Sequence, residues 1–200
     1  MKRLITPATL IAVLVCASAA LAHGPTVGVT GIQAPADATA GTPGDPCAAT
    51  DPETGRVPVV SNAMAGSLIG CWYTDTFNLI DSTASGVIYA SGSEHFVGCL
   101  DVRRKGSCAQ TDRTGTLALK YTFLAQYDAT GREIWGGCQH TVVSGAGGFA
   151  GAVGRIDFQD NVANGTSSYV GLLTLQGREQ AARARAVATA AAVRRPASMC

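Results

Sequence analysis

Polar side chains that could perform acid–base chemistry occur in three strand-like stretches. Glu94 and His95 are adjacent in one, Gln139 and His140 in another, and Lys120 lies in a third. If Glu94 or His95 points into the protein interior, burial shifts its pKa and makes it a candidate acid or base. The alternative is that these residues decorate the solvent face of alternating strands. No set of residues specifies a reaction, so Glu94 and His95 are candidates only.

Cys138 and His140 share one side of a strand and suggest a thiol–imidazole pair. Same-face neighbours lie about 6.6 Å apart along a strand, beyond hydrogen-bond reach, so half of a disulfide is the favoured role of Cys138. His23, at the expected start of the mature chain, could hold copper together with His95 or His140. A long flexible lead-in is a poor platform for such a site, and we expect no metal.

The run from Gly145 to Ala150 formally matches the dinucleotide fingerprint G-x-G-x-x-[GA]. Strand residues follow it instead of a helix, and no acidic residue lies about 20 positions further on. We therefore expect no nucleotide cofactor.

From Gly66 onwards the sequence has the period-two pattern of strands. Strands are predicted over 66–78, 86–100, 115–127, 132–143, 152–159 and 167–176. Trp72 and Tyr73 should lie on opposite faces, Gly92 should mark a bulge, and 128–131 should form a tight turn. Short strands joined by short loops indicate an all-β fold: a small antiparallel up-and-down β-barrel of six to eight strands. An immunoglobulin-like sandwich is the alternative.

The glycine-rich turn after the 132–143 strand contains one large apolar side chain, Phe149. Glycine reaches backbone angles that are closed to other residues, which suits the bends of a curling sheet. We expect this turn to lie at one mouth of the barrel and Phe149 to plug it.

The run S-G-A-G-G-F-A-G-A-V-G-R, residues 144–155, resembles the glycine signature of allene oxide cyclase-like and dirigent-like barrels. Residues 131–140 and 115–123 resemble bacterial secreted members of that superfamily, and the resemblance covers roughly 66–176. It implies a barrel, and an isomerase or cyclase activity inside it. No counterpart of the plant cyclases' acidic residue and Asn-rich stretch lies between Gly66 and Asp81, so no catalytic residue is carried over.

Outside the barrel the chain divides into three parts. Residues 1–22 have the charged start, apolar run and small-residue cleavage site of a secretory signal peptide. Residues 23–65 indicate an irregular lead-in rich in Pro, Gly and Ala, and 177–200 a short Ala/Arg-rich helix or tail. The formal net charge of +1 gives no reason to expect nucleic acid as a partner. We expect a secreted, extracytoplasmic bacterial protein without a transmembrane segment.

Six of the seven cysteines follow the expected cleavage site. An even number in an oxidising compartment favours disulfides, and six cysteines allow fifteen complete pairings. Cys99–Cys108, which closes a short charged loop, is the single bridge we predict.

The expected lumen is lined by aromatic side chains, which suits a small apolar ligand. The candidate ligand-binding residues are Trp72, Tyr121, Phe123, Trp135 and Tyr169. Binding without covalent chemistry is the first hypothesis. An isomerase or cyclase is the second, and a cell-surface interaction domain with a filled barrel is the third. An open volume inside the barrel would separate the third from the others.

Overall fold

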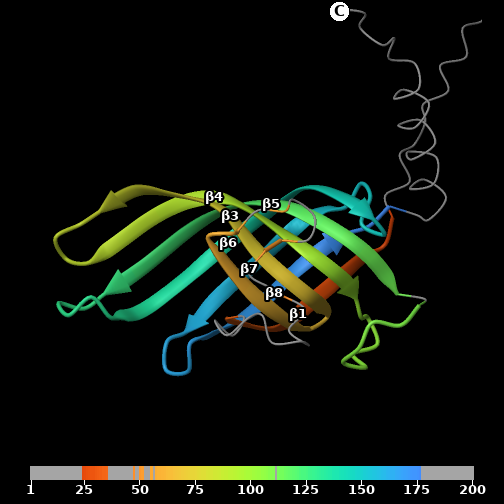
Figure 1. Cartoon of the computed structure of the whole chain (residues 1–200), viewed down its shortest axis with the longest axis horizontal. Helices are drawn as coiled ribbons and strands as arrows, with labels where there is room; N and C mark the ends of the chain where they lie inside the picture. Colours follow the sequence, from red (N-terminus) through yellow and green to blue (C-terminus); the bar gives the residue numbers. More distant parts are fainter. Residues whose placement is uncertain are drawn as a thin grey trace, which may run out of the picture.

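The computed structural model describes residues 24–35, 47, 50–51, 55, 57–110 and 112–176. Eight antiparallel strands form a closed barrel in which neighbours in sequence are neighbours in space and β8 pairs with β1 (Figure 1). Their bounds are β1 Thr26–Pro35, β2 Val60–Gly66, β3 Leu68–Ser82, β4 Val87–Leu100, β5 Arg113–Tyr127, β6 Glu133–Gly147, β7 Val153–Asn161 and β8 Thr166–Thr174.

The predicted all-β, antiparallel up-and-down barrel is confirmed, with eight strands. A sandwich would have two separate sheets, whereas here a single sheet closes on itself. The predicted signal peptide (1–22), and the predicted C-terminal helix or tail (177–200), lie outside the described residues. Within the described part of the chain, no helix is long and apolar enough to cross a membrane.

The barrel begins earlier than residue 66, so the predicted boundary between lead-in and barrel is wrong. β1 and β2 both arise from the stretch expected to be irregular, and β1 closes the barrel by pairing with β8 over residues 26–33. Only Val29 in β1 and Met64 in β2 are buried. Of the other inward positions, Val27 and Val60 are apolar, and the rest are glycine, proline or polar, which weakens the period-two pattern in the sequence.

The bulge predicted at Gly92 is also wrong. The register between β3 and β4 shifts instead between Thr74 and Thr76 and between Leu79 and Asp81. Gly92 has a different role, because a Cβ there would lie 1.9 Å from the Thr76 carbonyl oxygen and 2.7 Å from the Tyr121 ring. The absent side chain lets the Tyr121 hydroxyl reach across and donate to the Thr76 carbonyl at 3.0 Å.

One end of the barrel is filled by an apolar core, and Phe149 belongs to it as predicted. Phe149 is fully buried in the turn between β6 and β7 and meets the Phe96 ring edge-on at a centroid distance of 6.0 Å. Gly147 and Gly151 take positive φ angles of 63° and 69° on either side, a backbone conformation that glycine adopts without strain. Arg113 donates to the carbonyl of Gly148 and fastens the turn.

Among the described residues two disulfides form, Cys99–Cys108 and Cys47–Cys71. The first confirms the predicted bridge. The second attaches part of the lead-in to the outer face of β3. Cys138, expected to be half of a disulfide, carries a free thiol because its side chain points into the lumen.

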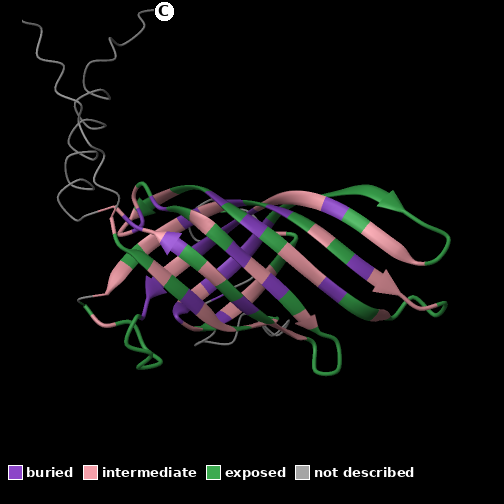
Figure 2. Ribbon diagram, turned by 180° about the vertical axis from the view of Figure 1, so that it is seen from behind, coloured by how far each residue is buried: buried purple, intermediate pink, exposed green. Residues whose placement is uncertain are grey.

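The opposite end carries the turns β3–β4, β5–β6 and β7–β8, which project as hairpins from the barrel (Figure 1). Residues 75–85 of the longest hairpin are exposed throughout, whereas buried residues gather in the body of the barrel (Figure 2). The end with these hairpins contains the candidate site.

Candidate functional site

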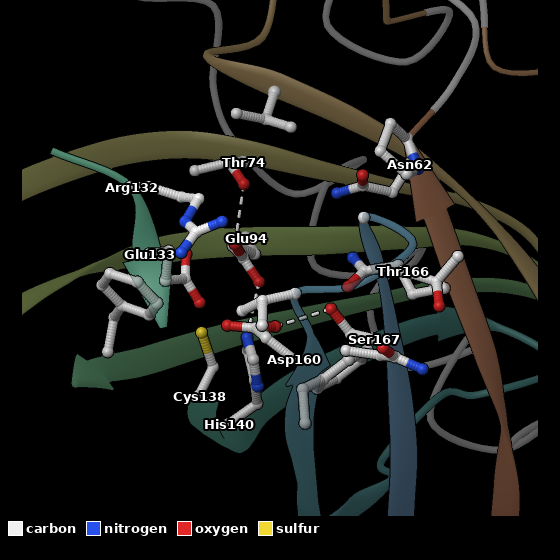
Figure 3. A pocket seen from close by; sticks show the side chains of 18 residues that line it. Asn62, Thr74, Glu94, Arg132, Glu133, Cys138, His140, Asp160, Thr166 and Ser167 are labelled. Carbon is white, nitrogen blue, oxygen red and sulfur yellow. Dashed lines mark hydrogen bonds and ion pairs between the residues drawn. The ribbon is translucent and has the colours of Figure 1, made fainter. Parts of the chain in front are cut away.

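The lumen opens into a cavity of about 490 Å³ at the hairpin end. Its walls come from the last residues of β1, β5 and β7 and the first residues of β2, β6 and β8, because an up-and-down barrel brings these ends together. Val60, Phe123 and Phe158 provide apolar wall, and polar side chains occupy the floor and one side (Figure 3).

Glu94 lies at the floor of the cavity with 8% of its surface exposed. The Thr74 hydroxyl donates to its carboxylate at 2.7 Å, and Nε2 of His140 lies 2.6 Å from it (Figure 3). The indole N–H of Trp72 also donates to this carboxylate. Thr74 is the direct cross-strand partner of Glu94, so strand register alone brings these two together. These contacts fix the orientation of the carboxylate at the floor of the cavity.

His140, on β6, is 2% exposed and faces an acceptor on each side. Nδ1 lies 3.3 Å from the Ile156 carbonyl oxygen and Nε2 lies 2.6 Å from Glu94 Oε2. Both ring nitrogens therefore face an oxygen atom, which fixes the orientation of the imidazole. The rings of Trp72 and Phe158 meet the imidazole edge-on at 5.2 and 4.8 Å. The pair is buried and fixed in orientation, and both residues line the cavity.

Two further carboxylates, Glu133 of β6 and Asp160 of β7, stand side by side above Gly136. A Cβ on Gly136 would lie 2.2 Å from Glu133 Oε1 and 2.5 Å from Asp160 Oδ2. Ser167 donates to Asp160 Oδ1 at 2.6 Å, while the buried Oε1 of Glu133 has no hydrogen-bond partner among the described residues. Burial first, and then the charge of Asp160, raise the pKa of Glu133.

The thiol of Cys138 lies among these acids. Burial, followed by the charges of Glu94, Asp160 and Glu133, raises its pKa well above its usual range. The thiol is therefore protonated at neutral pH and unsuited to nucleophilic attack. Both ring nitrogens of His140 face other groups, so the thiol–imidazole pair suggested by the sequence does not form.

Of the five predicted lumen aromatics, four lie inside the barrel. Trp72, Tyr121 and Tyr169 are buried, and Phe123 lines the cavity. Trp135 is 46% exposed on the outer face, so its predicted place in the lumen is wrong. The inward positions of β6 are Gly136, Cys138 and His140, and alternation therefore directs the neighbouring Trp135 outwards.

His95, the second candidate acid or base, lies on the outer face and not in the lumen. Its Nδ1 is 2.8 Å from Asp75 Oδ1, its Nε2 is 3.3 Å from Asp51 Oδ2, and its ring stacks on Tyr73 at 5.0 Å. It is 8% exposed there. Because Asp51 belongs to the lead-in, these contacts attach the lead-in to the barrel wall.

The remaining polar candidates do not join the site. Lys120 and Gln139 are exposed on the outer face. His23, the proposed copper ligand, lies outside the described residues, and its two possible partners, His95 and His140, lie on opposite sides of the barrel wall. In the described ranges no three His, Cys, Asp or Glu side chains are grouped to hold a metal ion.

Sequence reasoning missed Thr74, Glu133, Asp160 and Ser167. For Asp160 a signal existed, since it continues the inward phase of Ile156 and Phe158 along β7. Glu133 is the first residue of β6, directly after a turn, so no preceding alternation of strand residues shows which way its side chain points. Searches against family models, curated proteins and solved structures returned no match for this chain.

Proposed function

We propose that this protein binds a small organic molecule in the open half of its barrel. The observation that carries the proposal is the cavity of about 490 Å³ with the buried Glu94 at its floor. Ligand sites are concave, largely apolar, of about 300–1,000 Å³, and contain a few fixed polar groups. The cavity has these properties, and its open volume counts against the third hypothesis, a barrel filled by its own side chains.

An isomerase or cyclase activity is the second candidate. The buried Glu94–His140 pair beside the cavity favours it, as does the resemblance to allene oxide cyclase-like barrels. The Glu94 carboxylate is already engaged by Trp72, Thr74 and His140, so we place binding without covalent chemistry first.

The protein would act outside the cytoplasm. Disulfides persist in oxidising compartments, and Cys47–Cys71 and Cys99–Cys108 are both bonded. Secretion from a bacterial cell would place the cavity in contact with extracellular small molecules.

Native mass spectrometry of the protein purified from its own host tests the binding function. We expect a mass increment that disappears on denaturation. Asn62→Trp, which places a large ring in the cavity, should abolish the increment. The matched control, Lys120→Trp on the exposed outer face of β5, should retain it. An increment that persists in both variants would place the ligand elsewhere, and no increment in any sample would favour a barrel without a ligand.

A further inference from the structure

We infer that the ligand carries a positively charged group, a protonated amine, which binds above Gly136 between Glu133 and Asp160. The inference rests on the proposed binding function and adds the chemical class of the ligand. An ammonium group supplies hydrogen-bond donors and charge, while the rest of the molecule occupies the apolar part of the cavity.

No donor group of the described residues reaches the buried Oε1 of Glu133. Its neighbour is the Asp160 carboxylate, with which it can form a hydrogen bond only when one of the two acids is protonated. The other oxygen, Oε2, lies 3.4 Å from the Tyr127 hydroxyl, which is a long contact. A buried polar atom without a partner costs free energy, and an ionised carboxylate costs more. A donor inside the cavity would remove this cost.

Three carboxylates line the cavity: Glu94, Glu133 and Asp160. Of these, only Glu94 has a histidine of the described ranges within hydrogen-bond distance, His140. Among the described residues no Lys, Arg or His nitrogen lies within ion-pair distance of Glu133 or Asp160.

Arg132 is the one Arg or Lys in the cavity lining. Its Nε lies 3.3 Å from Asp128 Oδ2, in the turn outside the strand, and its side chain is 80% exposed. Arg132 therefore pairs with Asp128 and is mostly exposed, so it does not form an ion pair with Glu133 or Asp160.

The clustered carboxylates affect the pKa values of two groups in the cavity, Glu133 and Cys138. The pKa of Glu133 and that of Cys138 are both raised, by burial first and by the surrounding carboxylates second. In the empty cavity a proton on Glu133 relieves the repulsion from Asp160. A bound cation performs the same task without a proton, so ligand binding and protonation of Glu133 compete.

The shape of the cavity favours an organic cation over a metal ion. Phe123 and Phe158 form part of the wall, and no group of three metal-ligating side chains occurs in the described ranges. Aromatic walls suit the hydrocarbon body of an amine and can attract its charge through their ring faces.

Three probes that share a naphthalene ring separate charge from shape: 2-(1-naphthyl)ethylamine, 2-(1-naphthyl)ethanol and 1-naphthylacetate. Binding of each to the full chain is measured by calorimetry at pH 7.5 in about 0.15 M salt. We expect the ammonium to bind about tenfold or more tightly than the alcohol, and the carboxylate most weakly. Glu133→Gln combined with Asp160→Asn should remove the preference for the ammonium and leave the affinity for the alcohol within about twofold.

The matched control is Asp157→Asn. Asp157 lies in β7, like Asp160, but on the outer face of the barrel, where it pairs with Arg155. This variant should leave the order of the three probes unchanged. Lowering the pH towards the raised pKa of Glu133 should weaken binding of the ammonium and not of the alcohol.

Each outcome is decisive. Equal binding of ammonium and alcohol overturns the inference about charge and leaves the binding function standing. Binding of none of the probes counts against both. If the double variant does not fold, the comparison of the three probes on the unaltered protein still decides.

Discussion

Phe149→Ala is expected to be among the most destabilising single substitutions in the chain. Phe149 is fully buried between the closed end of the barrel and Phe96. Burying a Phe stabilises a protein by about 1.5–3 kcal/mol, and truncation to Ala costs about 3–5 kcal/mol when a cavity remains. The surrounding turn cannot collapse into the space, because Arg113 fastens it at Gly148. We therefore expect a loss of about 3–5 kcal/mol.

The assay is equilibrium unfolding in guanidinium chloride with the disulfides intact. The matched control is Phe77→Ala in the β3–β4 hairpin, where Phe77 is 48% exposed. Its effect should stay below about 1 kcal/mol. Equal small effects from both variants would refute the reasoning, since Phe149 would then be in solvent and the glycine turn would be a mobile lip.

Three further predictions concern the interior charges and the lead-in. Glu94→Leu leaves His140 Nε2 without its acceptor and should cost about 3–5 kcal/mol in the free energy of unfolding, whereas replacing both residues by Leu should cost less than the sum of the single changes. Glu133→Gln should stabilise the protein at neutral pH. The folded protein holds the Glu133 pKa above its ordinary value of 4.5, so stability falls as the pH rises from the ordinary pKa to the raised pKa of the folded state. A pH series of unfolding curves should show this decline in the unaltered protein and not in Glu133→Gln. Joint replacement of Cys47 and Cys71 by Ala should cost about 3–4 kcal/mol by the loop-entropy relation for their separation of 24 residues, and thermal unfolding measures it.

Each of these has a contrary result. Additive losses from the Glu94 and His140 substitutions would mean that the two side chains do not interact. A pH profile unchanged by Glu133→Gln would show that Glu133 is not buried beside Asp160. Retention of full stability without Cys47–Cys71 would mean that the lead-in is not fastened to the barrel.

Much of the barrel could be predicted because local alternation is strong in β5, β6 and β8. In β5 the large residues Leu117, Leu119 and Tyr121 occupy one phase, and all three are buried. Phe149 was identifiable as the only large apolar side chain among the glycines. Cys99–Cys108 was identifiable because a short loop separates the two cysteines.

For β4, the strand before β5, the sequence did not show which set of alternate side chains faces the interior. Glu94 shares a face with Phe96, and His95 shares a face with Val97, so both phases contain an apolar residue and a polar one. Only closure of the barrel decides that Phe96 and Glu94 face inwards while His95 faces Asp75 and the lead-in.

The sequence by itself determined six of the eight strand-forming segments, the closed end and one disulfide, because these depend on residues close together in the chain. The site depends on pairings across the barrel. Glu94 and His140 are 46 positions apart, and Glu133 approaches Asp160 only because β6 and β7 pair. Local periodicity has no information about which distant strands become neighbours or in which register. That choice is made by the burial and hydrogen bonding of the whole sheet, so the tertiary structure alone decided where the acids of the cavity meet.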